Sequence, residues 1–361
     1  MTPLLLRAEP HLEDIPSTSL DFQSSVGRPV ANPRGTVTPC VLALTRADDP
    51  EIDELSLFLA AEGIPLVRID SDRCLDHPLS WDPLSRVLTW EGERFRPVVS
   101  WLRYFTVESM GTASMDTASM DTASWGTDGR TVTLYAREQW TAFVTAVVAG
   151  TRAINPGCLP GVPDRLSQLA AARAVGLPVP ASVVTTRLAD AADSIPGGGD
   201  LLVKSLGKHL IEDPPGRMRG VFPRRITRRE LAAERASEPA PVLVQEFVAA
   251  PRELRVNVVG GRLFPYAITR PSPESPWTEP ESIVVEPVTL SPELCARLTR
   301  LAGEFDLDIA AFDLLDAPEP VFLEVNPEGS WLWAERRTGS SLTSRAARDL
   351  VVDLFRKELR R

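Results

Sequence analysis

Residues 39–70 limit the possible folds more than any other part of this chain. The apolar run "CVLAL" (40–44) and the later "PLVRID" (65–70) each have the length and composition of a strand. Between them, "DPEIDELSLFLAAEG" predicts an amphipathic helix with Asp49 as its N-cap and Gly63 at its end. Two strands joined by one helix form a βαβ unit, which requires a parallel sheet. The first folded part of the chain is therefore predicted to be α/β.

Size and composition exclude several classes of protein. A chain of 361 residues is long enough for two or three domains. Its net charge of −10 argues against a nucleic-acid-binding protein, because such proteins are usually basic. No apolar run reaches the roughly 18 residues that span a membrane, and the N-terminus does not resemble a signal peptide. The four cysteines are far apart, which predicts neither a zinc site nor a disulfide framework. We expect a cytoplasmic protein with no nucleic-acid partner and no membrane partner.

The chain divides into a tail and three folded parts. Residues 1–38 are rich in proline, serine and aspartate and predict a flexible tail. Residues 39–150 form the first folded part, with a loop insertion at 106–130 that contains the repeat "TASMDTASMDTASW". The other two parts, 151–245 and 246–361, mix strands and helices throughout, so the complete chain is predicted to be α/β or α+β.

Three oxygen-bearing side chains fall on the last two predicted strands. In "FLEVNP" (322–327), Glu324 and Asn326 are two residues apart in a strand and therefore share one face. The preceding strand "AAFDLL" contains Asp313, a carboxylate that would be costly to bury unpaired. Oxygen ligands without histidine or cysteine suit Mg²⁺, which takes one or two carboxylates together with phosphate oxygens. The alternative is a turn carboxylate and a capping asparagine without a metal.

A basic segment begins at Lys204, at the end of the apolar strand "LLVK". From Lys204 to Arg229 there are eight lysines and arginines and two acidic residues, so the segment has a net charge of +6 (eight minus two). Lys204 predicts a phosphate contact, and the segment predicts a mobile cover over phosphates or an acidic substrate. The alternatives are a lysine that extends its ammonium group to solvent and an ordinary solvated loop.

A polar strand face is predicted in "PRELRVNVV". Glu253, Arg255 and Asn257 alternate with apolar residues there, so their side chains share one face. An acid, an arginine and an asparagine in a strand that is otherwise apolar predict the lining of a cavity. The alternative is a solvent-facing strand with an ion pair. Just before it, "LVQEFV" (243–248) is apolar except for its two central residues.

Taken in their order and spacing, these features resemble the ATP-grasp fold. The matching elements are Lys204, "LVQEFV", Asp313 and "EVN" at 324–326, and the resemblance covers residues 150–355 approximately. It implies that the three folded parts are, in order, a pre-ATP-grasp βαβ domain, a central lid subdomain and a C-terminal antiparallel-sheet subdomain with the catalytic residues.

A narrower set of motifs is similar to the ATP-grasp ligases that modify ribosomal peptides, the microviridin or graspetide type. The motifs are "VSWLRYF", "INP", "ELRVNVVGGRLF", Trp277 and, above all, "FLEVNPEGSWLW". Two features depart from the pattern. Arg165 lies where related enzymes often have a first phosphate-binding lysine, and arginine is bulkier. The TASMD insertion is the second departure.

The resemblance implies a role for each candidate residue. Arg165 and Lys204 would bind the α- and β-phosphates of ATP, and Glu253 would lie near the ribose. Arg255 would stabilise the transferring γ-phosphoryl group and the acyl phosphate. The adenine would contact Gln245, Glu246, Phe247 and Val248, mainly through backbone groups. Mg²⁺ would bind Asp313, Glu324 and Asn326, and the catalytic set would be Arg255, Lys204 and Asn257.

The function implied is an ATP- and Mg²⁺-dependent carboxylate ligase. It would activate Asp or Glu side chains of a ribosomal precursor peptide as acyl phosphates and form ω-ester or ω-amide macrocycles. The partner would be that peptide, with a leader and a core rich in acidic, Thr, Ser and Lys residues, and the enzyme would be a homodimer. The alternatives are a carboxylate–amine ligase for amino acids or small acids, a kinase on the same fold, and a non-catalytic nucleotide- or peptide-binding module.

Overall fold

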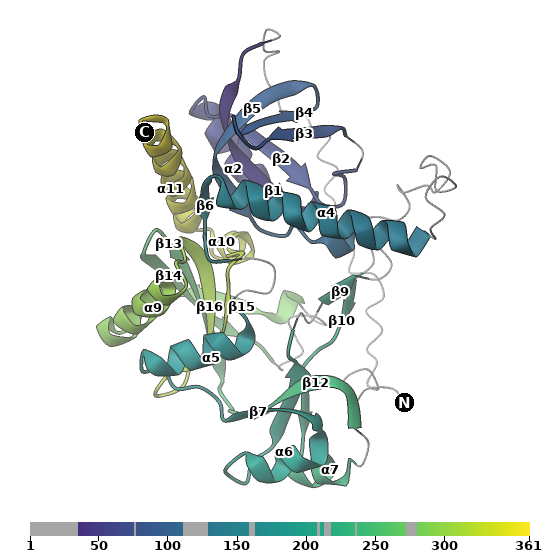
Figure 1. The fold of residues 1–361 in the computed structure, drawn as a ribbon. Helices are drawn as coiled ribbons and strands as arrows, with labels where there is room; N and C mark the ends of the chain where they lie inside the picture. The colour runs from purple at the N-terminus through teal and green to yellow at the C-terminus, as the bar shows by residue number, and fades with distance from the viewer. Residues whose placement is uncertain are drawn as a thin grey trace.

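A computed structural model of the chain contains three sheet-based units, which Figure 1 shows one above another. The structure describes residues 35–75, 77–110, 129–158, 163–207, 210–212, 218–234, 237–271 and 280–361. Most of the predicted tail, the TASMD repeat and Trp277 lie outside these ranges. Within them, no helix is long and apolar enough to cross a membrane.

The N-terminal unit is a six-stranded sheet with the order β2-β1-β5-β4-β3 and with β6 paired to β5. Its elements are β1 (Thr38–Thr45), α2 (Pro50–Ala61), β2 (Leu66–Asp70), β3 (Leu79–Asp82), β4 (Val87–Trp90), β5 (Glu93–Leu102), the short helix η1 (Val107–Ser109), α4 (Gly129–Ala149) and β6 (Arg152–Ile154). The strands β1 and β2 are parallel and α2 connects them, which confirms the predicted βαβ unit. The Asp49 side chain accepts a hydrogen bond from the Ile52 N–H and caps α2.

The central unit is a four-stranded antiparallel sheet with the order β11-β8-β12-β7, against which α6 and α7 pack. Its elements are β7 (Ser182–Arg187), α6 (Leu188–Ser194), β8 (Leu201–Ser205), β11 (Arg224–Ile226), α7 (Arg228–Ala233) and β12 (Ser237–Glu246). A separate ribbon of β9 (Leu210–Glu212) and β10 (Met218–Gly220) follows β8. Thr227 and Glu230 form a capping box that fixes the start of α7.

The C-terminal unit is a five-stranded antiparallel sheet with the order β15-β14-β13-β16-β17. Its elements are β13 (Arg252–Val259), β14 (Arg262–Thr269), η2 (Pro280–Ser282), β15 (Val284–Pro287), α9 (Pro292–Glu304), β16 (Ile309–Leu315), β17 (Val321–Asn326), α10 (Leu332–Thr338) and α11 (Leu342–Leu359). A tight turn at Gly260–Gly261 joins β13 to β14, and both glycines have a positive φ, as such a turn requires. Ser291 caps α9, because its Oγ accepts from the N–H of Leu294.

Two helices connect the units through shared cores. The helix α5 (Arg165–Ala174) lies within residues 151–245, the predicted central part. Its apolar residues nevertheless pack on the C-terminal sheet, with Leu169 in the same core as Phe312 and Phe322. The helix α11 packs against both the N-terminal unit and the C-terminal sheet. Its residue Val351 shares a core with Trp101 of β5. The N-terminal and C-terminal units therefore form one continuous apolar interface.

Asn155, in the "INP" motif, fixes the C-terminal sheet to the end of β6. Its Nδ2 donates to the carbonyl oxygens of Ile309 (2.6 Å) and Pro327 (2.8 Å). Its Oδ1 accepts from the backbone N–H groups of Asp308 (2.8 Å) and Ile309 (2.9 Å). Asn155 has a φ of 56°, a conformation that asparagine tolerates better than most residues. This one side chain holds the start of β16 beside the residue that follows β17.

Candidate functional site

A row of charged side chains crosses three neighbouring strands of the C-terminal sheet. Arg255 of β13 lies opposite Asp313 of β16, and Asp313 lies opposite Glu324 of β17. Because directly opposite residues of an antiparallel pair share one face, all three side chains project to the same side. The Arg255 Nη1 lies 2.8 Å from the Asp313 Oδ2 and 3.0 Å from the Oδ1. The strand pairing thus brings together the predicted phosphoryl-binding arginine and two predicted metal ligands.

Asn326 completes the predicted ligand set. It lies two residues beyond Glu324, and its Nδ2 donates to the Asp313 Oδ2 at 2.7 Å. Burial raises the pKa of the Asp313 carboxyl, and the nearby charge of Glu324 raises it further, whereas Arg255 opposes both effects. The structure therefore places Asp313, Glu324 and Asn326 side by side, as the sequence indicated. Their role as metal ligands stays a prediction.

Arg165 reaches this row from the first turn of α5. Its guanidinium lies 2.7 Å from the Glu324 Oε2, and both side chains are largely buried. Asp164 fixes the start of the helix by accepting from the N–H groups of Leu166 and Ser167. Each carboxylate of the predicted metal set therefore has its own arginine, Arg255 for Asp313 and Arg165 for Glu324.

Lys204 approaches the same row from the central sheet. It lies on β8 opposite Leu243, and only 7% of its surface is exposed. Burial lowers the pKa of its ammonium group to about 8; the charge of Arg165 adds to this effect, and Glu324 and Glu253 oppose it. A buried lysine among these charges is suited to an anion such as a phosphate, because the anion would restore its usual pKa.

Glu253 lies two residues before Arg255 on the same strand face and pairs with Arg270. Burial raises the pKa of its carboxyl to about 7; Asp313 and Glu324 contribute to the increase, and Arg270 opposes it. The predicted ribose contact is thus a carboxyl group that changes its charge near neutral pH.

Asn257 is the third residue of the polar strand face, and it differs from the other two. Its surface is 1% exposed, and neither its Oδ1 nor its Nδ2 has a hydrogen-bond partner among the described residues. The Arg255 Nε is also buried without a partner there. Buried polar atoms are nearly always hydrogen-bonded, so these three atoms are suited to a ligand or an ordered water.

The predicted adenine hinge joins the central and C-terminal sheets at the end of β12. Gln245 is buried, and its Nε2 donates to the Ser182 Oγ at 2.7 Å. The N–H of Glu246 donates to the Ala181 carbonyl, and the N–H of Phe247 to the Asp200 carbonyl. These two N–H groups are already used within the protein. An adenine contact through the hinge backbone would therefore use carbonyl groups or the N–H of Val248.

The basic segment has two kinds of arginine. Arg228 donates to the carbonyls of Ala192, Ile195, Pro196 and Gly199, so it closes the C-terminal end of α6 and is structural. Arg225 forms an ion pair with Asp200 and lies 4.1 Å from the centre of the Phe247 ring, beside the hinge. Lys208 and Arg217 lie outside the described residues. At least two arginines of the basic segment are therefore already bound within the protein, and fewer than eight of its positive charges are available to a ligand.

The donor set fits Mg²⁺ in its chemistry. Asp313 and Glu324 supply carboxylate oxygens and Asn326 an amide oxygen, all from one strand pair, and Lys204 lies near enough for the charge of Glu324 to act on its pKa. The Arg165 pair with Glu324 is one contact that would change on binding. If Arg165 turns to a phosphate, Glu324 becomes available to a cation.

Several residues near this row were not singled out from the sequence. The Ser330 carbonyl accepts from the Arg255 Nη2 at 3.1 Å. Tyr104 lies against Arg103, and burial raises the pKa of its phenol to about 12. Both lie in motifs shared with the peptide-modifying ligases, "EGSW" and "LRYF", and this resemblance is the signal by which they could have been found.

Comparisons with known proteins identify the fold. No family model and no curated protein matches this sequence. Among solved structures, the macrocyclase MdnC from Microcystis aeruginosa MRC, bound with precursor peptide MdnA, has a TM-score of 0.69 at 19% identity, over 88% of this chain and 99% of that one. The ATP-grasp ligase PsnB, complexed with a precursor variant, Mg and ADP, has a TM-score of 0.67 at 20% identity, over 88% and 99%. D-alanyl-alanine synthetase A from Vibrio cholerae has a TM-score of 0.56 at 14% identity, over 90% and 99%. The chain has the ATP-grasp fold, as predicted.

Proposed function

We propose that this protein is an ATP- and Mg²⁺-dependent ligase that activates carboxylates of a peptide. The observation that carries the proposal is the row Arg255–Asp313–Glu324–Arg165, with Lys204 beside it, in an ATP-grasp fold. The row combines paired carboxylates for a cation with cations for phosphates. Two solved proteins of similar fold, MdnC and PsnB, are described with bound precursor peptides, and PsnB with Mg and ADP.

The residues of the row would divide the work of phosphoryl transfer. Lys204 and Arg165 would bind the phosphates of ATP, and Arg255 would offset the charge that develops on the γ-phosphoryl group. Asp313, Glu324 and Asn326 would hold Mg²⁺, which supplies charge neutralisation at the phosphate oxygens. A substrate carboxylate oxygen would attack the γ-phosphorus, which gives an acyl phosphate and ADP. The side-chain amide of Asn257 and the Nε of Arg255, which have no partner among the described residues, would orient the acyl group.

The second step would close a ring. A Lys amine or a Ser or Thr hydroxyl of the same peptide would attack the acyl carbon, lose its proton and expel inorganic phosphate. Each ring thus removes one water from the peptide and converts one ATP to ADP and phosphate. The basic segment that begins at Lys204 suits an acidic peptide and would exclude water from the acyl phosphate. A homodimer and a cytoplasmic location stay predictions.

The test is a reaction with ATP, Mg²⁺ and the short acidic peptide encoded beside the gene, followed by mass spectrometry. We expect ADP and a peptide that has lost one water per ring. A peptide that gains a phosphate instead would identify a kinase. ADP formation with amino acids but not with peptides would favour the small-acid ligase, the class of the Vibrio neighbour. No nucleotide consumption with any acidic peptide or amino acid would contradict the proposal.

A further inference from the structure

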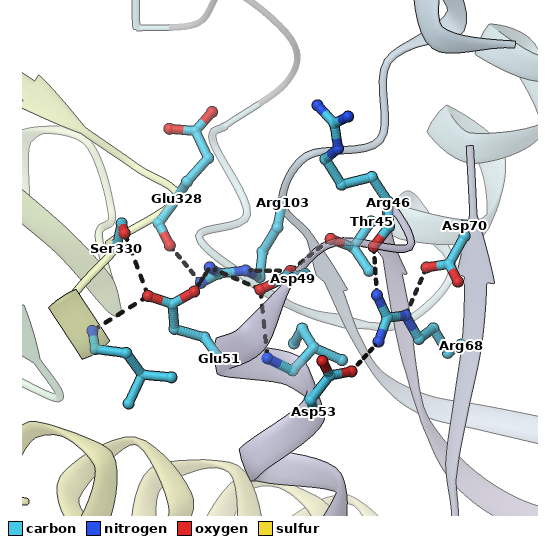
Figure 2. A network of polar contacts seen from close by, with 12 residues as sticks. Thr45, Arg46, Asp49, Glu51, Asp53, Arg68, Asp70, Arg103, Glu328 and Ser330 are labelled. Carbon is cyan, nitrogen blue, oxygen red and sulfur yellow. Dashed lines mark hydrogen bonds and ion pairs between the residues drawn. The ribbon is translucent and has the colours of Figure 1, made fainter. Parts of the chain in front are cut away.

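A buried cluster of charges lies where the N-terminal unit meets the residues that follow β17. Asp49, Glu51 and Arg103 are at most 5% exposed, and all three come from the N-terminal unit. Figure 2 shows Glu51 directed toward Ser330 and Arg103 directed toward Glu328, with Asp49 beside Arg103. Residues 327–331, which join β17 to α10, are called the β17–α10 loop below. The cluster thus forms ion pairs within the N-terminal unit and hydrogen bonds to a second unit, with which it also shares an apolar core.

Glu51 binds the β17–α10 loop through a single oxygen. Its Oε1 accepts from the Ser330 Oγ (3.2 Å) and from the N–H groups of Trp331 (3.1 Å) and Leu332 (3.2 Å). Glu51 lies in the first turn of α2, where Asp49 fixes the start of the helix. The helix α2 of the N-terminal unit therefore fixes the residues that follow β17 in the C-terminal unit.

Arg103 binds the same loop and also orients Glu51. Its Nη1 donates to the Glu328 carbonyl, and its Nη2 lies 3.3 Å from the Glu51 Oε2. Its Nε and Nη2 both donate to Asp49, at 2.9 and 3.2 Å. The guanidinium also lies 5.5 Å from the centre of the Trp331 ring. Every nitrogen of the guanidinium is used, so its position has little freedom.

The other side of the loop faces the candidate site. The Ser330 carbonyl accepts from Arg255, whose other terminal nitrogen binds Asp313. Gly329 keeps the loop against the sheet, because a Cβ there would lie 2.8 Å from the Ile309 side chain. One rigid loop therefore has Glu51 and Arg103 on one side and Arg255 on the other.

We infer that Glu51 and Arg103 are positioning residues for Arg255, and that they act through the β17–α10 loop. Neither side chain contacts Arg255 in the structure. Glu51 accepts from the Ser330 hydroxyl, Arg103 donates to the Glu328 carbonyl two residues before it, and the Ser330 carbonyl fixes the direction of the Arg255 guanidinium. The inference deepens the proposed function, since it rests on Arg255 as the group that stabilises the transferring phosphoryl. It makes the N-terminal unit part of the catalytic apparatus.

The test compares Glu51→Gln and Arg103→Lys with the control Arg68→Lys. Arg68 lies in the same unit and pairs with Asp53 and Asp70, but none of its contacts involves the β17–α10 loop, as Figure 2 shows. Glu51→Gln keeps an acceptor of the same shape, and Arg103→Lys keeps the charge, so both should fold. Thermal melting verifies this for each variant.

For both test variants we expect the kcat of ADP formation to fall by about ten- to a hundredfold, because small displacements of a catalytic group have effects of this size. The affinity for ADP should change little, since Arg165 and Lys204 are untouched. Binding of AMPPNP should weaken relative to ADP, because only AMPPNP carries the γ-phosphoryl group. Arg255→Lys should show the same loss of discrimination.

The outcomes separate the inference from the proposed function. If the test variants keep the kcat and the AMPPNP-to-ADP ratio of Arg68→Lys, the inference is wrong. If the wild-type protein consumes no ATP with any acidic substrate, the proposed function is wrong. The nucleotide-binding ratio still tests the positioning in that case, since it requires no substrate. Equal loss of AMPPNP and ADP binding would also overturn the inference, because it would indicate general damage.

Discussion

Two clusters of arginine and carboxylate side chains lie on either side of the β17–α10 loop, and they differ in how fully their polar atoms are paired. In the junction cluster, Arg103, Asp49 and Glu51 use every side-chain nitrogen and oxygen. In the row of the candidate site, the Arg255 Nε and both polar atoms of Asn257 lack a partner among the described residues. The three charged residues of the junction are fully paired within the protein, whereas the row has three buried polar atoms that suit a ligand or an ordered water.

The difference separates structure from function in physical terms. Unpaired buried polar atoms destabilise a fold by about 1–3 kcal/mol each, so they persist where something other than stability requires them. A fully paired buried cluster has no such destabilising atoms. Removing one of its members, however, leaves the remaining charges without partners. The comparison predicts different effects for the two clusters: substitutions in the row should affect turnover more than stability, and substitutions in the junction should affect both.

The largest effect is expected at Glu324. Glu324→Gln should reduce ADP formation by about a thousandfold or more, because it removes a charged ligand of the cation that neutralises the phosphates. The melting temperature should change little, since Glu324 is partly exposed and its only described ion pair is with Arg165. The control is Glu319→Gln, on the exposed connection between β16 and β17. Activity that survives in Glu324→Gln would refute the metal assignment.

The next effect concerns stability at the junction. Glu51→Leu should lower the free energy of unfolding by about 3 kcal/mol, because it leaves three N–H and O–H donors and part of the Arg103 charge unpaired. Urea denaturation of the variant and the wild type measures the difference. A loss below about 1 kcal/mol would place Glu51 among ordinary surface ion pairs and remove the contrast with the row.

The sequence predicted those features of the two regions that depend on local patterns. The βαβ unit, the Asp49 N-cap and the face shared by Glu324 and Asn326 depend on local sequence patterns, and the structure has each of them. The order of Arg255, Asp313 and Glu324 across three strands depends on register, which the sequence could not provide. The junction cluster joins residues almost 280 positions apart, such as Glu51 and Ser330, and no local pattern marks such a contact.

A third prediction uses pH to test Lys204. Its pKa of about 8 in the ligand-free protein means that the ammonium is charged below pH 8 and loses its proton above it. Phosphate binding needs the charged form, so the affinity for ATP should fall as pH rises through 8, by up to about tenfold per pH unit. Calorimetric titrations from pH 7 to 9.5 measure this. Lys204→Arg should bind ATP without the decrease, and an equal decrease in both proteins would assign it to another group.

A smaller effect distinguishes two buried asparagines. Asn257→Leu should raise the free energy of unfolding by about 1 kcal/mol, because it removes two unpaired polar atoms, while it lowers kcat. Asn155→Leu is the matched control: Asn155 is also buried but makes four hydrogen bonds, so its loss should destabilise by about 3 kcal/mol. Urea denaturation compares the two. If both variants were equally destabilised, Asn257 would have a structural partner and no free binding capacity.

The formation of an acyl phosphate is the central claim, and hydroxylamine trapping tests it most directly. The protein is incubated with ATP, Mg²⁺, the acidic precursor peptide and hydroxylamine, and the peptide is sequenced by tandem mass spectrometry. We predict hydroxamates on Asp or Glu side chains, in amounts that match the ADP formed, and neither product with Glu324→Gln. A peptide phosphorylated on a hydroxyl group, or ADP without any hydroxamate, would contradict the account.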